Sequence, residues 1–99
     1  MNGRERLPDR RGCDTRYMRV GKHEYVVTVG RYGNGVVGEI FVAGAKVGSD
    51  MDAVMRDAAI LLSLALQHGV PIDTMRGAIT REENSSPSSI IGAVLDHLK

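Results

Sequence analysis

Apolar and polar residues alternate through the first half of the chain, a pattern typical of short strands. Residues 24–32 place three apolar side chains on one face of an extended chain: Tyr25, Val27 and Val29. Residues 14–20 have the same character, and Gly21-Lys22 separates the two runs. Gly33-Asn34-Gly35 favours a hairpin, because Asn-Gly tolerates the positive φ of a tight turn. We therefore predict a third strand over residues 36–43 and an antiparallel meander.

The apolar spacing then changes to three and four residues, which predicts a long helix over residues 49–68. Its stripe consists of Met51, Val54, Met55, Ala58, Leu61, Leu62 and Ala65. Ser49 can cap the first turn, and Gly69 and Pro71 end the helix. Because the stripe is broad, we expect this helix to be covered on more than one side.

Shorter helical patterns follow the long helix. Residues 72–79 are expected to form a helix with Asp73 as a cap, and residues 80–89 a polar loop. Ser88 or Ser89 can cap a last helix, whose apolar face holds Ile90, Ile91, Val94, Leu95 and Leu98.

These elements predict an α+β fold: a small antiparallel β-meander packed on one long helix, followed by a C-terminal helical segment. Ninety-nine residues fit a single domain. Its parts are a basic arm (1–12), the meander (13–43), the long helix (49–68) and the helical segment (72–98).

Charge is unevenly placed in this domain. Residues 1–22 hold seven Lys/Arg and three Asp/Glu, a net of +4, whereas residues 23–99 hold six and nine, a net of −3. The basic arm is read either as a solvated tail or as a grip on a phosphate or an acidic partner. The chain has neither a membrane-length apolar run nor the pattern of a secretory signal, so we expect a cytoplasmic protein.

One group of residues suggests an anion site. The loop from Gly44 to Ser49 precedes a helix N-terminus, where backbone N–H groups and a lysine could hold a phosphate. The paired arginines of the arm could add guanidinium donors. The expected ligand-binding residues are Arg10, Arg11, Lys46, Gly48 and Ser49. A plain capped turn beside a solvated arm is the alternative, because this spacing fits no known phosphate-binding motif.

No catalytic or metal-binding constellation is legible. The histidines at positions 23, 68 and 97 are scattered, and Cys13 is the single cysteine. One thiol excludes an internal disulfide and an all-cysteine zinc cluster. We expect no metal, no cofactor and no enzymatic activity, and we consider nucleic acid an improbable partner.

Small residues on the long helix allow another helix to approach: Ala58, Ala59, Ser63 and Ala65. They suit either packing within the chain or a self-complementary contact. We expect a homo-oligomer, most simply a twofold dimer, through this helix or an edge of the sheet.

Several segments together resemble the TSCPD-type domain, which is found near the C-terminus of adenosylcobalamin-dependent ribonucleotide reductases and as small stand-alone proteins. They are Leu7-Pro8-Asp9-Arg10-Arg11, Val27-Thr28-Val29-Gly30, Gly38-Glu39-Ile40-Phe41-Val42, Gly44 through Asp50, and Ser63 through Pro71. The family takes its name from Thr-Ser-Cys-Pro-Asp ahead of the last helix, with cysteines thought to bind zinc. Here that stretch reads Asn84-Ser85-Ser86-Pro87-Ser88, so the zinc function does not carry over.

The resemblance implies a non-catalytic accessory module that binds a nucleotide or a ribonucleotide reductase. Two alternatives stay open. The chain could be an oligomeric sponge that sequesters cyclic nucleotide immune signals, as small anti-defence proteins of phages do, or a structural homodimer without a ligand.

Overall fold

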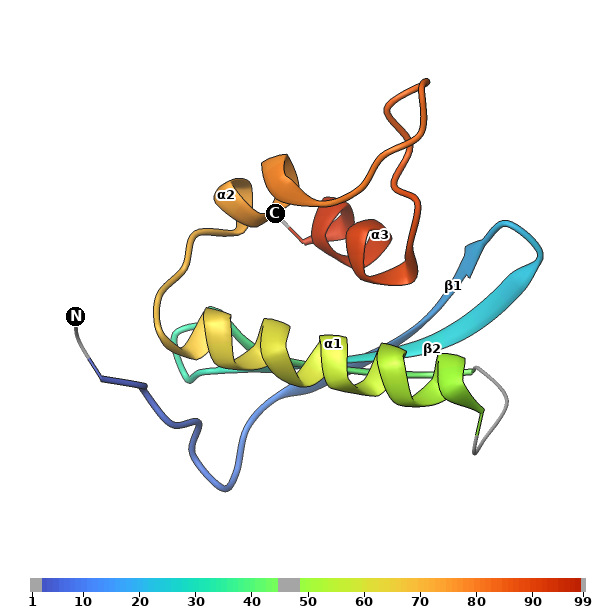
Figure 1. The fold of residues 1–99 in the computed structure, drawn as a ribbon. Helices are drawn as coiled ribbons and strands as arrows, with labels where there is room; N and C mark the ends of the chain where they lie inside the picture. The colour runs from blue at the N-terminus through green and yellow to red at the C-terminus, as the bar shows by residue number, and fades with distance from the viewer. Residues whose placement is uncertain (1–2, 45–48, 99) are drawn as a thin grey trace.

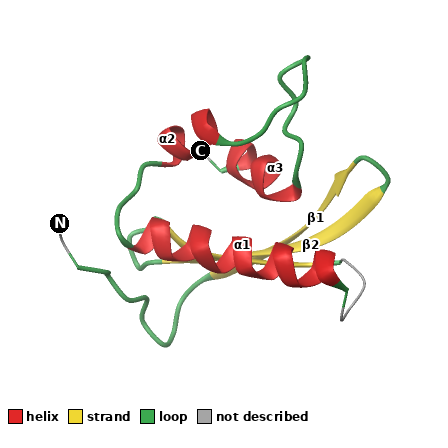
Figure 2. Ribbon diagram, viewed as in Figure 1, coloured by secondary structure: helices red, strands yellow, loops and turns green. Residues whose placement is uncertain are grey.

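A three-stranded sheet and three helices make up the fold, as the predicted α+β class requires (Figures 1 and 2). The computed structural model describes residues 3–44 and 49–98. In chain order the elements are β1 (Cys13–Val20), β2 (His23–Arg31), β3 (Val37–Ala43), α1 (Asp50–Gln67), α2 (Ile72–Ala78) and α3 (Ile90–His97). Each strand and helix lies within one or two residues of its expected bounds.

The sheet is an antiparallel meander in the order β1-β2-β3. Its register places Val27 opposite Val42 and Val29 opposite Ile40, so these four side chains share one face and are buried. The predicted turn is present, with Gly35 at a φ of 87° and its N–H bonded to the Tyr32 carbonyl at 2.9 Å. A residue with a side chain would be strained at this φ, which explains why glycine is found there.

A bulge interrupts the pairing of β2 and β3. Gly30 pairs with Glu39 but Arg31 pairs with Val37, so Gly38 is the extra residue. The bulge returns Val37 to the same face as Val29, and Val37 is buried there. Without this extra residue, the strict two-residue alternation would put Val37 on the opposite face.

Helix α1 lies along the outer edge of β3. The Ser63 hydroxyl accepts the Ile40 N–H at 2.8 Å, and the Gln67 side-chain amide donates to the Gly38 carbonyl at 2.9 Å. These side chains occupy backbone groups that a fourth strand would otherwise bond. Ser49 caps the start of α1 by accepting the Asp52 N–H at 3.0 Å, as expected.

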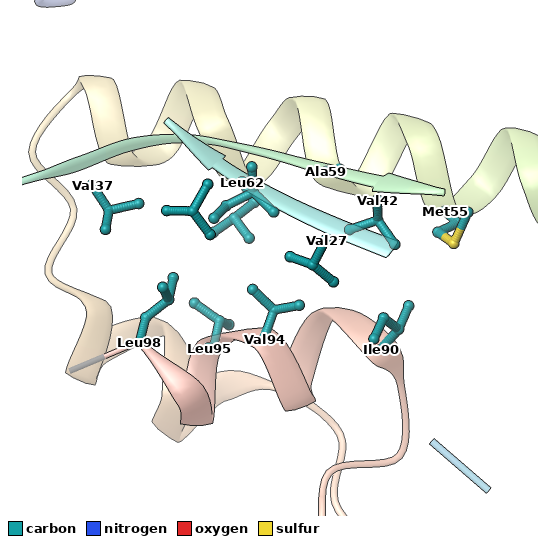
Figure 3. Close-up of a cluster of buried hydrophobic side chains, with 12 residues drawn as sticks. Val27, Val37, Val42, Met55, Ala59, Leu62, Ile90, Val94, Leu95 and Leu98 are labelled. Carbon is teal, nitrogen blue, oxygen red and sulfur yellow. The ribbon is translucent and has the colours of Figure 1, made fainter. Parts of the chain in front are cut away.

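The core fills the space between the sheet, α1 and α3 (Figure 3). Its members are drawn from all three: Val27, Val42, Met55, Leu62, Val94 and Leu98 are among them. Ser89 caps α3 by accepting the Gly92 N–H at 3.1 Å. The residues expected on the inner face of α3 are buried, except that Ile91 is half-buried.

Helix α2 begins at Ile72 as expected, but its cap differs from the expected one. Its N-cap residue is Pro71, which offers no side-chain bond, and Asp73 lies in the first turn instead. Asp73 pairs with Arg76 at 3.3 Å, so its carboxylate acts on a side chain and not as a cap.

The polar loop 80–89 is an ordered connection between α2 and α3. Arg81 and Pro87 form an isolated antiparallel bridge. The Arg81 guanidinium donates to both Asp96 oxygens at 2.8 Å, and Arg76 donates to the same carboxylate at 3.2 Å. Two arginines therefore tie the loop and α2 to α3.

Within the described residues, α1 is covered on one side only, contrary to the expectation of cover on several sides. Met55, Ala59 and Leu62 are buried, but Val54 is 65% exposed and Leu61 67%. Ala59 and Ser63 turn toward the sheet, so these two small residues serve packing within the chain. The homo-oligomer stays a prediction. Among the described residues, no helix has the length and apolarity needed to span a bilayer.

Candidate functional site

Two of the residues expected to bind an anion, Lys46 and Gly48, lie outside the described residues, so the structure does not test the expected site. Arg11 is engaged elsewhere: its guanidinium bonds both oxygens of Glu39 and the Pro8 carbonyl, the last at 2.6 Å. The hydrogen bond to Glu39 raises the pKa of Arg11. Glu39 is itself buried and lies over Gly30, so this ion pair fixes the arm to the sheet.

The arm also contacts the C-terminal end of α1, far from Ser49. The Glu5 N–H donates to the Gln67 carbonyl at 2.9 Å, and Tyr32 donates its hydroxyl hydrogen to the Glu5 carbonyl. Burial beneath the arm raises the pKa of Tyr32. The 18 residues of α1 span about 27 Å, so Glu5 lies about one helix length from Ser49.

The structure describes two of the remaining expected ligand residues, Arg10 and Ser49. Arg10 is exposed, and Ser49 is bonded to the first turn of α1. Lys46 and Gly48 lie outside the described residues. The predicted site therefore stays a prediction.

A different surface stands out: the face of the sheet that points away from α3, which we call the outer face. Two rows of paired residues cross it, Tyr17 with Val26 and Ala43, and Thr15 with Thr28 and Phe41. Tyr17 is 82% exposed and Phe41 54%. In Figure 1 the short helices α2 and α3 both lie on the other side of the sheet.

A groove of about 400 Å³ runs between the outer face and α1. Val26, Thr28 and Phe41 form its sheet side, and Ile60 and Arg56 its helix side. Ile60 is 54% exposed, so the apolar surface continues from strand to helix. Arg56 pairs with Asp52 across 3.9 Å at one end. An apolar groove with few charges suits another protein surface better than it suits an inorganic ion.

The sequence analysis did not single out Tyr17 or Phe41. The available signal was the apolar run in β3, where Ile40, Phe41 and Val42 alternate between the two faces. A strand that is apolar on both faces is usually covered on both. One face is covered by α3. Among the described residues the other is covered by the arm at Glu39 but exposed at Tyr17 and Phe41.

The described residues show no grouping of three or more His, Cys, Asp or Glu side chains placed to hold a metal. Cys13 is exposed, and its thiol lies 3.9 Å from the Arg11 carbonyl. His97 contacts Arg16 instead of another ligand-type residue.

Most of the chain is similar to known proteins. The TSCPD domain family model matches residues 3–98. The chain is 42% identical over 77 residues to a vitamin B12-dependent ribonucleotide reductase of Agrobacterium fabrum, covering 78% of this chain and 6% of the relative. The corresponding enzyme of Bradyrhizobium diazoefficiens is 40% identical over 80 residues, or 81% of this chain and 6% of that one.

A third relative, the vitamin B12-dependent ribonucleotide reductase of Rhodopirellula baltica, is 40% identical over 72 residues, covering 73% of this chain and 7% of its own length. The chain thus spans a small fraction of the curated relatives it matches. No solved structure matches it.

Proposed function

The chain belongs to the TSCPD domain family, and we propose that it is a non-catalytic accessory module that binds a ribonucleotide reductase through the outer face of its sheet. We place this interaction in the cytoplasm. The single observation that carries the proposal is an open apolar face on a domain whose relatives hold the same segment within reductase chains.

The size of the match supports a binding role. In the relatives the matching segment is 6–7% of the chain, so most of each relative lies outside it. A surface that packs against the rest of such a chain is expected to be apolar, and to be exposed when the matching segment is seen by itself.

The composition of the outer face fits a protein contact. Aromatic residues are enriched where binding energy concentrates, because they bury a large area with few rotatable bonds. Tyr17 and Phe41 supply two such anchors, and Ile60 extends the apolar area beside Phe41. Thr15 and Thr28, whose hydroxyls lie 3.4 Å apart, supply polar groups between the anchors.

The test is binding of the purified chain to the Agrobacterium fabrum reductase with its own matching segment deleted. We expect saturable binding by surface plasmon resonance. Phe41→Asp should weaken it by at least tenfold, because a carboxylate would be desolvated at the contact. Val36→Asp is the matched control: Val36 is 55% exposed, like Phe41, but lies at the hairpin turn.

Two outcomes would overturn the proposal. One is no binding to the shortened reductase by chain that is folded by circular dichroism. The other is equal weakening by Phe41→Asp and Val36→Asp, which would place the contact away from the outer face.

A further inference from the structure

A second hollow lies on the opposite face of the sheet, between the strands and α3; we call it the basic cleft. Its volume is about 250 Å³. Its apolar walls include Val27 and Val29 from β2 and Val94 from α3, whereas Arg16, Arg31 and His97 are its basic lining residues. Val27, Val29 and Val94 belong to the core and are 1 to 3% exposed, so the accessible apolar lining consists of the half-buried Met18 and Ile72. Figure 3 shows Val27 and Val94 within that core.

The strand register explains why arginines line this cleft. Arg16 pairs with Val27, so it lies on the core face, but on the edge strand β1. Arg31 follows Val29 by two residues along β2 and lies on the same face. Arginine at such an edge position keeps its charged end near water while its stem covers apolar side chains.

The charges at the cleft are unbalanced. Arg31 donates to Asp14 at 3.3 Å and to the Gly35 carbonyl at 3.0 Å. The Arg16 guanidinium contacts a ring nitrogen, Nε2 of His97. A guanidinium can only donate, so Nε2 accepts in this contact. Among the described residues, Asp14 pairs with Arg31, and no carboxylate forms an ion pair with Arg16.

The basic cleft also has room beyond its lining. A neighbouring hollow of about 640 Å³ shares Val37, Ile72 and Leu98 with it. Val37 and Leu98 are core residues, so an elongated apolar group that enters between the arginines would extend toward α2 past Ile72.

We propose that the basic cleft binds a small organic anion whose phosphate or carboxylate is held by Arg16 and Arg31 and whose apolar body lies against Met18 and Ile72. A planar guanidinium offers paired N–H donors, which match both kinds of anion. The surrounding apolar walls strengthen such contacts by excluding water. This site is distinct from the expected Arg10, Arg11 and Lys46 site and from the outer face.

The experiment is isothermal titration calorimetry of the full chain with three probes: adenosine 5′-monophosphate, octanoate and inorganic phosphate. The first two share an anionic group joined to a body, so they distinguish a nucleotide from a carboxylic acid as the ligand. We expect at least one of them to bind tenfold more tightly than inorganic phosphate. Arg16→Gln and Arg31→Gln should each weaken that binding by at least fivefold.

Arg19→Gln is the matched control. Arg19 lies on the same strand, three residues from Arg16, but on the outer face, where it pairs with Glu24 at 3.6 Å. This variant should bind the probe as the unaltered chain does. Arg16→Gln should still bind the reductase, which separates this proposal from the proposed function.

The proposal is overturned if folded protein binds neither organic anion at millimolar concentration. It is equally overturned if Arg16→Gln and Arg31→Gln bind as tightly as Arg19→Gln. Should Arg31→Gln fail to fold because its bond to Asp14 is lost, the exposed Arg16 alone decides the question.

Discussion

The hydroxyl of Ser63, on α1, contacts both backbone polar groups of Ile40, on β3. Its oxygen accepts the Ile40 N–H at 2.8 Å and lies 3.2 Å from the Ile40 carbonyl oxygen. Its single proton can go to that carbonyl or to the Ala59 carbonyl at 2.9 Å. One helix side chain thus takes the place of a neighbouring strand at the centre of β3.

The first prediction concerns this contact. Ser63→Ala would leave the Ile40 N–H without its partner in a half-buried position, which costs about 1 to 3 kcal/mol. Urea denaturation followed by circular dichroism measures the change in the free energy of unfolding. Ser86→Ala, in the exposed part of loop 80–89, is the control and should change it by less than about 0.5 kcal/mol. Equal effects would show that Ser63 does not support the edge.

The second prediction concerns Gly30, which lies beneath Glu39. A methyl group at Gly30 would overlap the Glu39 side chain, so the carboxylate would have to move away from Arg11. We expect Gly30→Ala to destabilise the fold by about 1 to 3 kcal/mol. Gly12→Ala is the control, because nothing lies within 4 Å of its added carbon. An unchanged urea denaturation midpoint for Gly30→Ala would contradict this prediction, because it would mean that Glu39 and Arg11 can move without a loss of stability.

The third prediction is a dependence on pH. Hydrogen bonds from Arg81, and then from Arg76, hold the pKa of Asp96 well below its usual range. A depressed pKa stabilises the fold above the unfolded pKa of about 3.9, and that stabilisation is lost as pH falls toward the folded value. The difference in unfolding free energy between the unaltered chain and Asp96→Asn should therefore be constant above about pH 5 and shrink below about pH 4.

Thermal melts between pH 2.5 and 7 would measure this difference. Asp73→Asn serves as the comparison, since the Asp73 side chain is 92% exposed although it also contacts Arg76. Its substitution should change the melting temperature little at any pH. If the difference in stability between the unaltered chain and Asp96→Asn grew at low pH, the assigned role of the two arginines would be contradicted.

The fourth prediction addresses the expected homo-oligomer. The exposed side of α1 carries Met51, Val54 and Leu61, each about two-thirds exposed. If this side is the contact between two chains, Leu61→Arg should lower the mass measured by light scattering to that of one chain. Ser63→Arg would not be a clean test, because Ser63 contacts Ile40 within the chain. A monomer mass for the unaltered chain at tens of micromolar would refute the oligomer.

The sequence predicted the elements well because their signals are local. Alternation placed the strands, and Ser49, Ser89 and Gly35 act at the cap and turn positions where their chemistry is favoured. Asp73 was misassigned as a cap because a proline before it occupies that position. Such a choice depends on one residue's backbone conformation, which composition alone does not reveal.

The sites were harder to predict because they depend on register. Arg11 looked like a free phosphate ligand, but the fold brings Glu39, 28 residues away, to its guanidinium. Likewise, Arg16 and Arg31 line one cleft only because a two-residue turn and a meander align their strands. The spacing of residues along the chain does not show which residues the fold brings together.

Helix α1 covers the outer edge of β3, so among the described strands the open edge of the sheet is that of β1. In the part of the chain that the structure describes, a further strand, from another protein or from a second copy of this chain, would bond the open backbone edge of β1. If two copies joined there about a twofold axis, each would use up its partner's open edge, and the ribbon would stop at six strands instead of growing into a fibre. Backbone pairing in this fold is therefore self-limiting.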